Sequence, residues 1–114
     1  MHIPRDALLL RIYIGEDEKV GHLPLYEAIV LKAREMHLAG ATVLRGPIGF
    51  GRSTLLHTSK ILRLSENLPM VVEIVDAENK INAFVQALET MMSSGLVTLE
   101  KVQVLQYGTD KANS

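Results

Sequence analysis

The stretch that most constrains the fold of this chain is the run Met-Val-Val-Glu-Ile-Val at residues 70–75. Branched and apolar side chains favour an extended backbone, because they pack well on a pleated surface. Apolar residues lie on both sides of the run, which predicts a strand with both faces covered. The remainder of the chain must therefore supply the elements that cover this strand.

Further strands and two helices are predicted from the spacing of apolar residues. Strands are expected at residues 7–14, from about residue 42 into a glycine-rich loop, at 60–64 and at 97–105. The first helix should start at Pro24 and be capped by Gly40, while Asp76 should cap the second helix and Gly95 should close it. The core stripe of the second helix comprises Ile81, Phe84, Val85, Leu88 and Met92.

The predicted order is strand, helix, strand, strand, helix, strand. This βαββαβ order indicates a ferredoxin-like α+β sandwich, in which an antiparallel sheet carries both helices on one face. We expect one domain over residues 1–108 and a frayed tail at 109–114, which has no apolar anchor.

Two apolar surfaces predict an oligomer. Leu9 and Tyr13 would lie on the sheet face without helices, and exposed apolar surface of this kind marks an interface. The first helix is apolar over more than one face, which also favours packing against a second subunit. The residues that widen its apolar surface are Tyr26, Val30, Leu31 and Leu38.

Residues 45–52 read Arg-Gly-Pro-Ile-Gly-Phe-Gly-Arg and form a candidate ligand-binding loop. Glycine permits a positive φ and a close approach of the backbone to a ligand, and successive N–H groups in such a turn can bind an anion. The guanidinium groups of Arg45 and Arg52 suit phosphate. The run matches neither the Walker loop nor the dinucleotide fingerprint. Two interpretations stay open, a loop that contacts a phosphorylated ligand and a hairpin whose arginines face water.

Composition excludes several classes of function. The chain has no cysteine, which removes disulfides, thiolate catalysis and zinc ribbons. Its formal net charge is −1 and it has no tryptophan, whereas nucleic-acid binders carry a basic excess and aromatic platforms. The longest apolar runs, such as residues 7–10, are too short to span a membrane. We therefore expect a cytoplasmic protein without nucleic-acid binding or membrane insertion.

The run Gly-Ala-Thr-Val at residues 40–43, with Gly-Phe-Gly-Arg at 49–52, resembles the start of the regulatory T-loop in PII signalling proteins. Over residues 7–107 the chain is more similar still to a poorly characterised family of small PII-like proteins. The stretches that carry this similarity are 25–28, 40–43, 45–46, 49–51 and 95–102.

The resemblance implies a homotrimeric regulatory protein rather than an enzyme, with its three sheets around a central core and an adenine nucleotide in the clefts between subunits. By position, Thr42 matches the residue that contacts adenine, and Gly49, Gly51 and Arg52 match the base of the T-loop near the phosphates. The other candidate ligand-binding residues are Arg45, Gly46, Phe50, Gly95, Leu96, Val97 and Thr98. The polar loop 52–59 would contact a target protein such as a membrane transporter.

AMP, ADP, ATP and cyclic AMP are the candidate ligands, and none is expected to be an obligatory cofactor. PII proteins carry a longer glycine-rich segment with a basic residue after their second helix, whereas this chain passes almost directly from Gly95 into its last strand. A nucleotide with one or two phosphates, or a cyclic one, would need fewer donors. No tyrosine occurs at 46–59, so a T-loop tyrosine is not available for uridylylation.

Other interpretations remain. Trimeric CutA proteins, which act in metal tolerance, share this architecture, and a scaffold or interaction protein without a nucleotide is a further alternative. His2, His22, His37 and His57 show no ligand spacing, and the acidic loop 15–21 is open to two readings, a cation site or a solvated turn. Acylphosphatases have a similar glycine loop, but it follows their first strand rather than their second. No catalytic residues are assigned, because Ser53 and His57 lack an oriented third partner.

Overall fold

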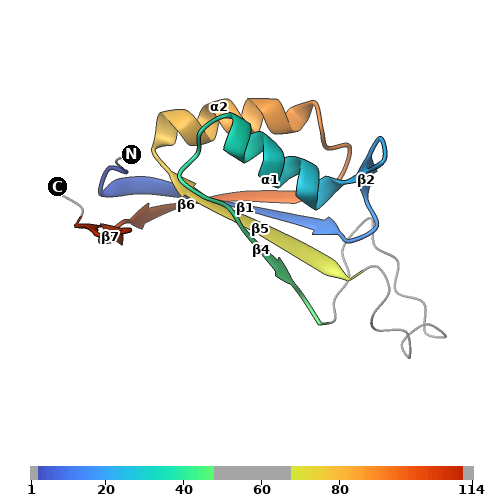
Figure 1. The fold of residues 1–114 in the computed structure, drawn as a ribbon, viewed down its shortest axis with the longest axis horizontal. Coiled ribbons are helices and arrows are strands. Elements are labelled where there is room, and N and C mark those ends of the chain that lie inside the picture. Colours follow the sequence, from blue (N-terminus) through green and yellow to red (C-terminus); the bar gives the residue numbers. More distant parts are fainter. Residues whose placement is uncertain (1–2, 48–67, 112–114) are drawn as a thin grey trace.

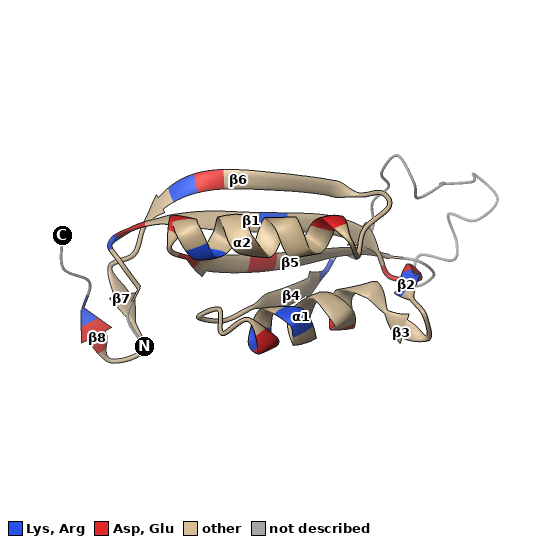
Figure 2. Cartoon of the chain, turned by 90° about the horizontal axis from the view of Figure 1, so that it is seen from above, with Lys and Arg blue, Asp and Glu red and all other residues tan. Residues whose placement is uncertain are grey.

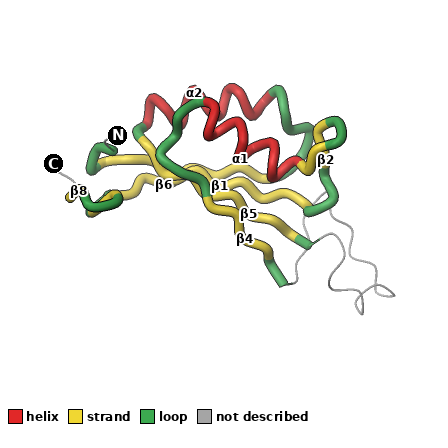
Figure 3. Tube along the Cα trace, in the orientation of Figure 1, coloured by secondary structure: helices red, strands yellow, loops and turns green. Residues whose placement is uncertain are grey.

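In the computed structural model, which describes residues 3–47 and 68–111, a four-stranded antiparallel sheet has the order β4–β5–β1–β6. Its strands are β1 (Asp6–Gly15), β4 (Thr42–Arg45), β5 (Pro69–Asp76) and β6 (Leu96–Gln103). Helices α1 (Leu25–Glu35) and α2 (Glu78–Glu89) lie together on one side of the sheet (Figures 1 and 3). The strand order and the placement of the helices confirm the ferredoxin-like α+β sandwich.

The core is the apolar layer between the sheet and the two helices. Its fully buried apolar side chains are Leu10, Ile12, Ile29, Val72, Ile74, Ile81 and Phe84. The stripe predicted for α2 is confirmed, because Ile81, Phe84 and Leu88 are buried while Val85 and Met92 pack against the core. Deleting a buried side chain as large as Phe84 costs about 3–5 kcal/mol, so this layer dominates the stability of the fold.

Within the single chain the helices cover one face of the strand β5, and cover for the other face, which we also expected, would have to come from outside the chain. Buried Met70, Val72 and Ile74 alternate with half-buried Val71 and Val75, which point away from the helices. We call this second surface the open face. The strand pairing places apolar residues of all four strands on this face, among them Leu9, Tyr13, Leu44, Val71, Val75 and Leu96.

The strand β6 lies at the edge of the sheet beyond the strip that the two helices cover (Figure 2). Leu99 pairs with the buried Leu10 and therefore points to the helix side, yet it is 48% exposed. Val97 pairs with Ile12 and is 40% exposed. The β6 edge is thus apolar on both of its faces and uncovered in the single chain.

The end of α1 differs from the prediction that Gly40 caps it. The helix ends at Glu35, and His37 takes the left-handed conformation with φ 61°. Its N–H donates to the Arg34 carbonyl at 3.1 Å, and the Leu38 N–H donates to the Ala33 carbonyl at 3.0 Å. This is a Schellman motif formed without glycine. The start also differs slightly, since Pro24 precedes the first helical residue.

Asp76 does not cap α2, contrary to the prediction. The N-cap residue is Ala77, without a side-chain hydrogen bond, and the helix ends at Glu89 rather than near Gly95. Asp76 is buried because it continues the inward row of β5. Its carboxylate accepts hydrogen bonds from the backbone N–H groups of Ala77 at 2.7 Å and Ala39 at 2.8 Å. The side chain therefore ties β5 to the loop before β4.

Two small hairpins were not predicted. β2 (Lys19–Val20) pairs with β3 (Leu23–Pro24), and β7 (Gln106–Tyr107) pairs with β8 (Asp110–Lys111). Part of the segment expected to be a frayed tail is therefore a paired strand, with Gly108 at φ 63° in the turn. Residues 112–114 and the strand piece expected at 60–64 lie outside the described residues.

Candidate functional site

The predicted ligand-binding residues that the structure describes belong to opposite edges of the sheet. Thr42, Arg45 and Gly46 lie on or just after β4, whereas Leu96, Val97 and Thr98 open β6 and follow Gly95. Gly49, Phe50, Gly51, Arg52 and the loop 52–59 lie outside the described residues, so their roles stay predictions.

The strand register places the two edges in line. Thr42 pairs with Glu73, Glu73 with Arg11, and Arg11 with Thr98, so Thr42 and Thr98 end one row across the sheet. Three inter-strand spacings of about 4.8 Å separate the ends of this row by about 14 Å. Thr42 and Thr98, at the two edges of the sheet of one chain, therefore cannot both contact the same phosphate group.

An ion-pair network fills the middle of this row on the open face. Arg11 Nε donates to Glu73 Oε2 at 2.8 Å, and Arg11 Nη1 donates to Glu100 Oε1 at 3.0 Å. The hydrogen bond to Glu73 raises the pKa of Arg11 above its ordinary value. The network links β1, β5 and β6 within a surface that is otherwise largely apolar.

Arg45 ends β4 at the point where the chain leaves the sheet. The Gly46 N–H donates to the Pro69 carbonyl at 2.8 Å and closes the pairing with β5. The Arg45 guanidinium pairs with the carboxylate of Glu16, which lies in the turn after β1. The Arg45 side chain is 56% exposed.

The turn at residues 15–18 joins separate parts of the chain. The Glu16 N–H donates to the Leu68 carbonyl at 2.8 Å, directly before β5. The Glu18 carboxylate accepts hydrogen bonds from Gly15 N at 2.7 Å and from Ser94 Oγ at 3.2 Å, next to Gly95. The contact of Glu16 with Arg45 was not predicted, because the partners are 29 residues apart and no local pattern marks the pair.

Gly95 sits in a tight turn before β6. Its φ is 127°, and an added Cβ would lie 2.8 Å from Met92 Cε and 2.9 Å from the Tyr13 carbonyl oxygen. Only glycine fits this position without strain. The turn presents Leu96, which is 57% exposed, at the start of β6.

A hollow of about 740 Å³ lies beside Thr42. Its walls come from the loop before β4, the open face and the segment after β6, and include Gly40, Ala41, Leu9, Glu73, Leu105 and Tyr107. The Tyr107 hydroxyl donates to the Ala39 carbonyl at 2.6 Å and fastens the C-terminal wall to the loop. We did not predict this wall, although Gly108 after Tyr107 is a turn signal that could have indicated a hairpin.

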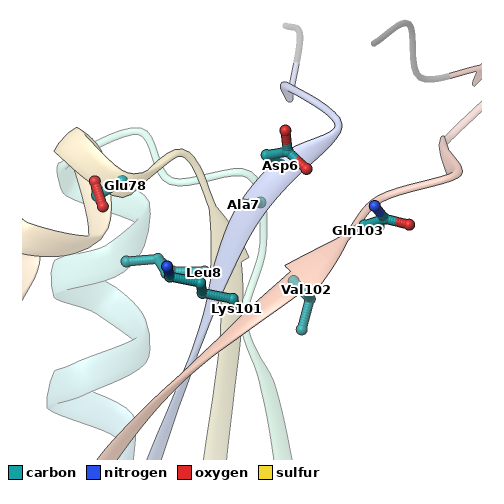
Figure 4. A pocket seen from close by; sticks show the side chains of 7 residues that line it. All are labelled: Asp6, Ala7, Leu8, Glu78, Lys101, Val102 and Gln103. Carbon is teal, nitrogen blue, oxygen red and sulfur yellow. The ribbon is translucent and has the colours of Figure 1, made fainter.

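A second hollow of about 480 Å³ lies between the starts of β1 and α2 and the end of β6 (Figure 4). Asp6, Glu78, Lys101 and Gln103 supply its polar side chains. It is at the opposite end of the sheet from Arg45 and contains none of the predicted site residues.

Metal ligands do not gather in the described part of the chain, where no three His, Asp or Glu side chains are close enough to hold an ion. His2 and His57 lie outside that part. Within residues 3–47 and 68–111, no helix combines the length and apolar character that crossing a membrane requires.

Known proteins are similar to this chain in sequence and in fold. Residues 7–104 match the family DUF190, described as "Uncharacterized ACR, COG1993". The UPF0166 protein of Aquifex aeolicus is 40% identical over 97 residues, which are 85% of this chain and 91% of the relative.

Two solved structures have folds similar to that of this chain. CPII of Thiomonas intermedia K12, bound to ADP and bicarbonate, has a TM-score of 0.62 at 14% identity over 87% of this chain and 88% of its own. The GlnK–ATP complex of B. subtilis has a TM-score of 0.57 at 13% identity over 89% and 85% of the two chains. This likeness confirms the predicted PII-like fold.

Proposed function

The chain belongs to the DUF190 family and has a PII-like fold, and on that premise we propose that it is a regulatory protein that binds an adenine nucleotide between the subunits of a homotrimer. No catalytic step is part of this proposal. A cytoplasmic location and contact of the segment 52–59 with a target protein, such as a membrane transporter, belong to the same proposal.

The observation that carries the proposal is the position of the candidate residues at opposite edges of one sheet. Thr42 and Arg45 lie on β4 and Thr98 lies on β6, with two strands between them. A ring of subunits with head-to-tail contacts brings the β4 edge of one chain to the β6 edge of the next. The apolar open face supports such an assembly, because surface of this kind marks interfaces.

The chemistry of the β4 edge supports a nucleotide as the ligand. Thr42 and Arg45 are three residues apart on the edge strand β4, or about 10 Å along it, which resembles the span from an adenine base to its phosphates. Their side chains point to opposite faces of the sheet, so a ligand that contacts both must pass around the β4 edge. The Thr42 hydroxyl can hydrogen-bond a base, and the exposed guanidinium of Arg45 can donate to a phosphate. CPII and GlnK carry ADP and ATP in the structures named above.

Calorimetric titration with AMP, ADP, ATP and cyclic AMP tests the proposal. We expect saturable binding at one site per subunit, with ADP or AMP ahead of ATP. Arg45→Ala should weaken ADP binding about tenfold, since a charged hydrogen bond contributes about 1.5 kcal/mol or more. Arg34→Ala, an exposed arginine in the last turn of α1, is the matched control and should bind ADP normally. Flat traces with all four nucleotides on a folded protein would reject nucleotide binding.

A further inference from the structure

We propose that Glu16 sets the affinity of the site by competing with the ligand: its carboxylate occupies the Arg45 guanidinium, and a phosphate group must displace it to bind. The inference rests on the proposed nucleotide function, because it concerns the same arginine. It adds a residue from the turn after β1 to the determinants of binding.

The geometry makes Glu16 the fixed partner of the pair and Arg45 the adaptable one. The Glu16 side chain is 19% exposed, whereas that of Arg45 is 56% exposed. The backbone of Glu16 is held by its N–H donating to the Leu68 carbonyl at 2.8 Å. The turn is closed by Glu18, whose N–H donates to the Gly15 carbonyl at 3.2 Å and whose carboxylate accepts from Gly15 N at 2.7 Å. The carboxylate is therefore presented to Arg45 by a braced turn.

Glu16 and a phosphate group compete for the same atom of Arg45, Nη2, which pairs with Glu16 Oε2. Carboxylate and phosphate oxygens both accept paired hydrogen bonds from a guanidinium, so they compete for the same donors. A phosphate at Arg45 breaks the ion pair and also lies near the displaced carboxylate, which repels it. Both effects act in the same direction and weaken the binding of any phosphorylated ligand.

The magnitude is modest, because the pair is partly exposed. Exposed ion pairs contribute little, and their loss corresponds to a change in affinity of about two- to five-fold. Screening at about 0.15 M salt limits the effect to charges within about 8 Å, so charge changes elsewhere on the molecule should leave binding unchanged.

The experiment compares Glu16→Gln with Glu78→Gln by calorimetric titration with ADP and with adenosine at physiological salt. Glu78 is the control, since it is exposed at the start of α2, loses the same charge and lies at the opposite end of the sheet from Arg45. We expect Glu16→Gln to tighten ADP binding about two- to five-fold and Glu78→Gln to change it little. Adenosine, which has no phosphate, should bind all three proteins equally. In an Arg45→Ala background, Glu16→Gln should lose most of its effect.

The outcomes separate this inference from the nucleotide function. Equal affinities of the wild type and Glu16→Gln for ADP would overturn the role of Glu16 and leave nucleotide binding intact. If ADP binds neither protein, the proposed function fails. The competition between Glu16 and phosphate is then tested by titration with pyrophosphate, with binding monitored through the NMR signal of the Arg45 Nε–Hε group. Tighter pyrophosphate binding in Glu16→Gln then supports it, whereas equal binding or an unmoved signal overturns it. Should Glu16→Gln fail to fold, Glu16→Asp, which shortens the reach to Arg45, should bind ADP more tightly than the wild type.

Discussion

At the scale of single residues, a comparison of alanine substitutions at Gly95 and Gly40 tests the tight turn before β6. Gly95 has a φ of 127° and close neighbours on both sides of the absent Cβ, whereas Gly40 has no atom within 4 Å of that position. Gly95→Ala should lower the free energy of unfolding by about 2–4 kcal/mol, through backbone strain and overpacking. Gly40→Ala should leave it unchanged or raise it by about 0.5 kcal/mol. Urea unfolding measures both, and equal effects would contradict the tight turn before β6.

From the sequence we predicted that both glycines lie at the boundaries of secondary-structure elements, but not which structural role each one has. Each was expected to end a helix, whereas α1 ends at Glu35 and the left-handed residue that follows it is His37. That conformation costs a non-glycine residue about 1–2 kcal/mol. Here the cost is offset by the Schellman hydrogen bonds and by burial of Leu38 beside Ala33. Burial of this kind depends on the whole fold and leaves no local signal.

The C-terminal hairpin of β7 and β8 is joined to the loop before β4 by the side chain of Tyr107. The Tyr107 hydroxyl donates to the Ala39 carbonyl at 2.6 Å, across 68 residues of sequence. Tyr107→Phe should lower the free energy of unfolding by about 1 kcal/mol, the net contribution of a hydrogen bond. Tyr26→Phe is the control, because Tyr26 packs against the core and no hydrogen bond of its hydroxyl is seen within the described residues. An equal loss in both variants, measured by urea unfolding, would contradict the tether.

At the scale of elements, β1, β5, β6 and both helices were predictable because their apolar residues form a run or a repeating spacing over several residues. The four-residue strand β4 was predicted from the glycine-rich loop that it leads into. The hairpins of β2–β3 and β7–β8 have strands of two residues each, which is too short for any periodicity. The predicted cap at Asp76 failed for a related reason. A carboxylate before a helix looks the same in sequence whether it caps the helix or, as here, turns inward to bind Ala39.

At the scale of the whole molecule, the candidate site was predictable only in part. The candidate residues of β4 and β6 were predicted from the glycine signals and from the resemblance to PII-like proteins. Of these residues, the structure places Thr42 and Thr98 at the two ends of one row across the sheet. The contribution of Glu16 was not predictable, because it depends on the approach of the turn after β1 to the end of β4. How two edges of different chains meet is a property of the assembly.

The assembly itself can be tested with two leucines of similar exposure. Leu44 lies on the open face and is 50% exposed, while Leu31 lies on α1 and is 54% exposed. Light scattering should give the wild type three times the mass of the 12.6 kDa chain. Leu44→Lys should yield monomers that no longer bind ADP, because a lysine at a closed apolar interface is left without water or a partner. Leu31→Lys should remain trimeric and bind ADP. If Leu31→Lys is monomeric and Leu44→Lys remains trimeric, the interface lies on α1 instead. If the wild type is a monomer that binds ADP, the proposed site between subunits is rejected.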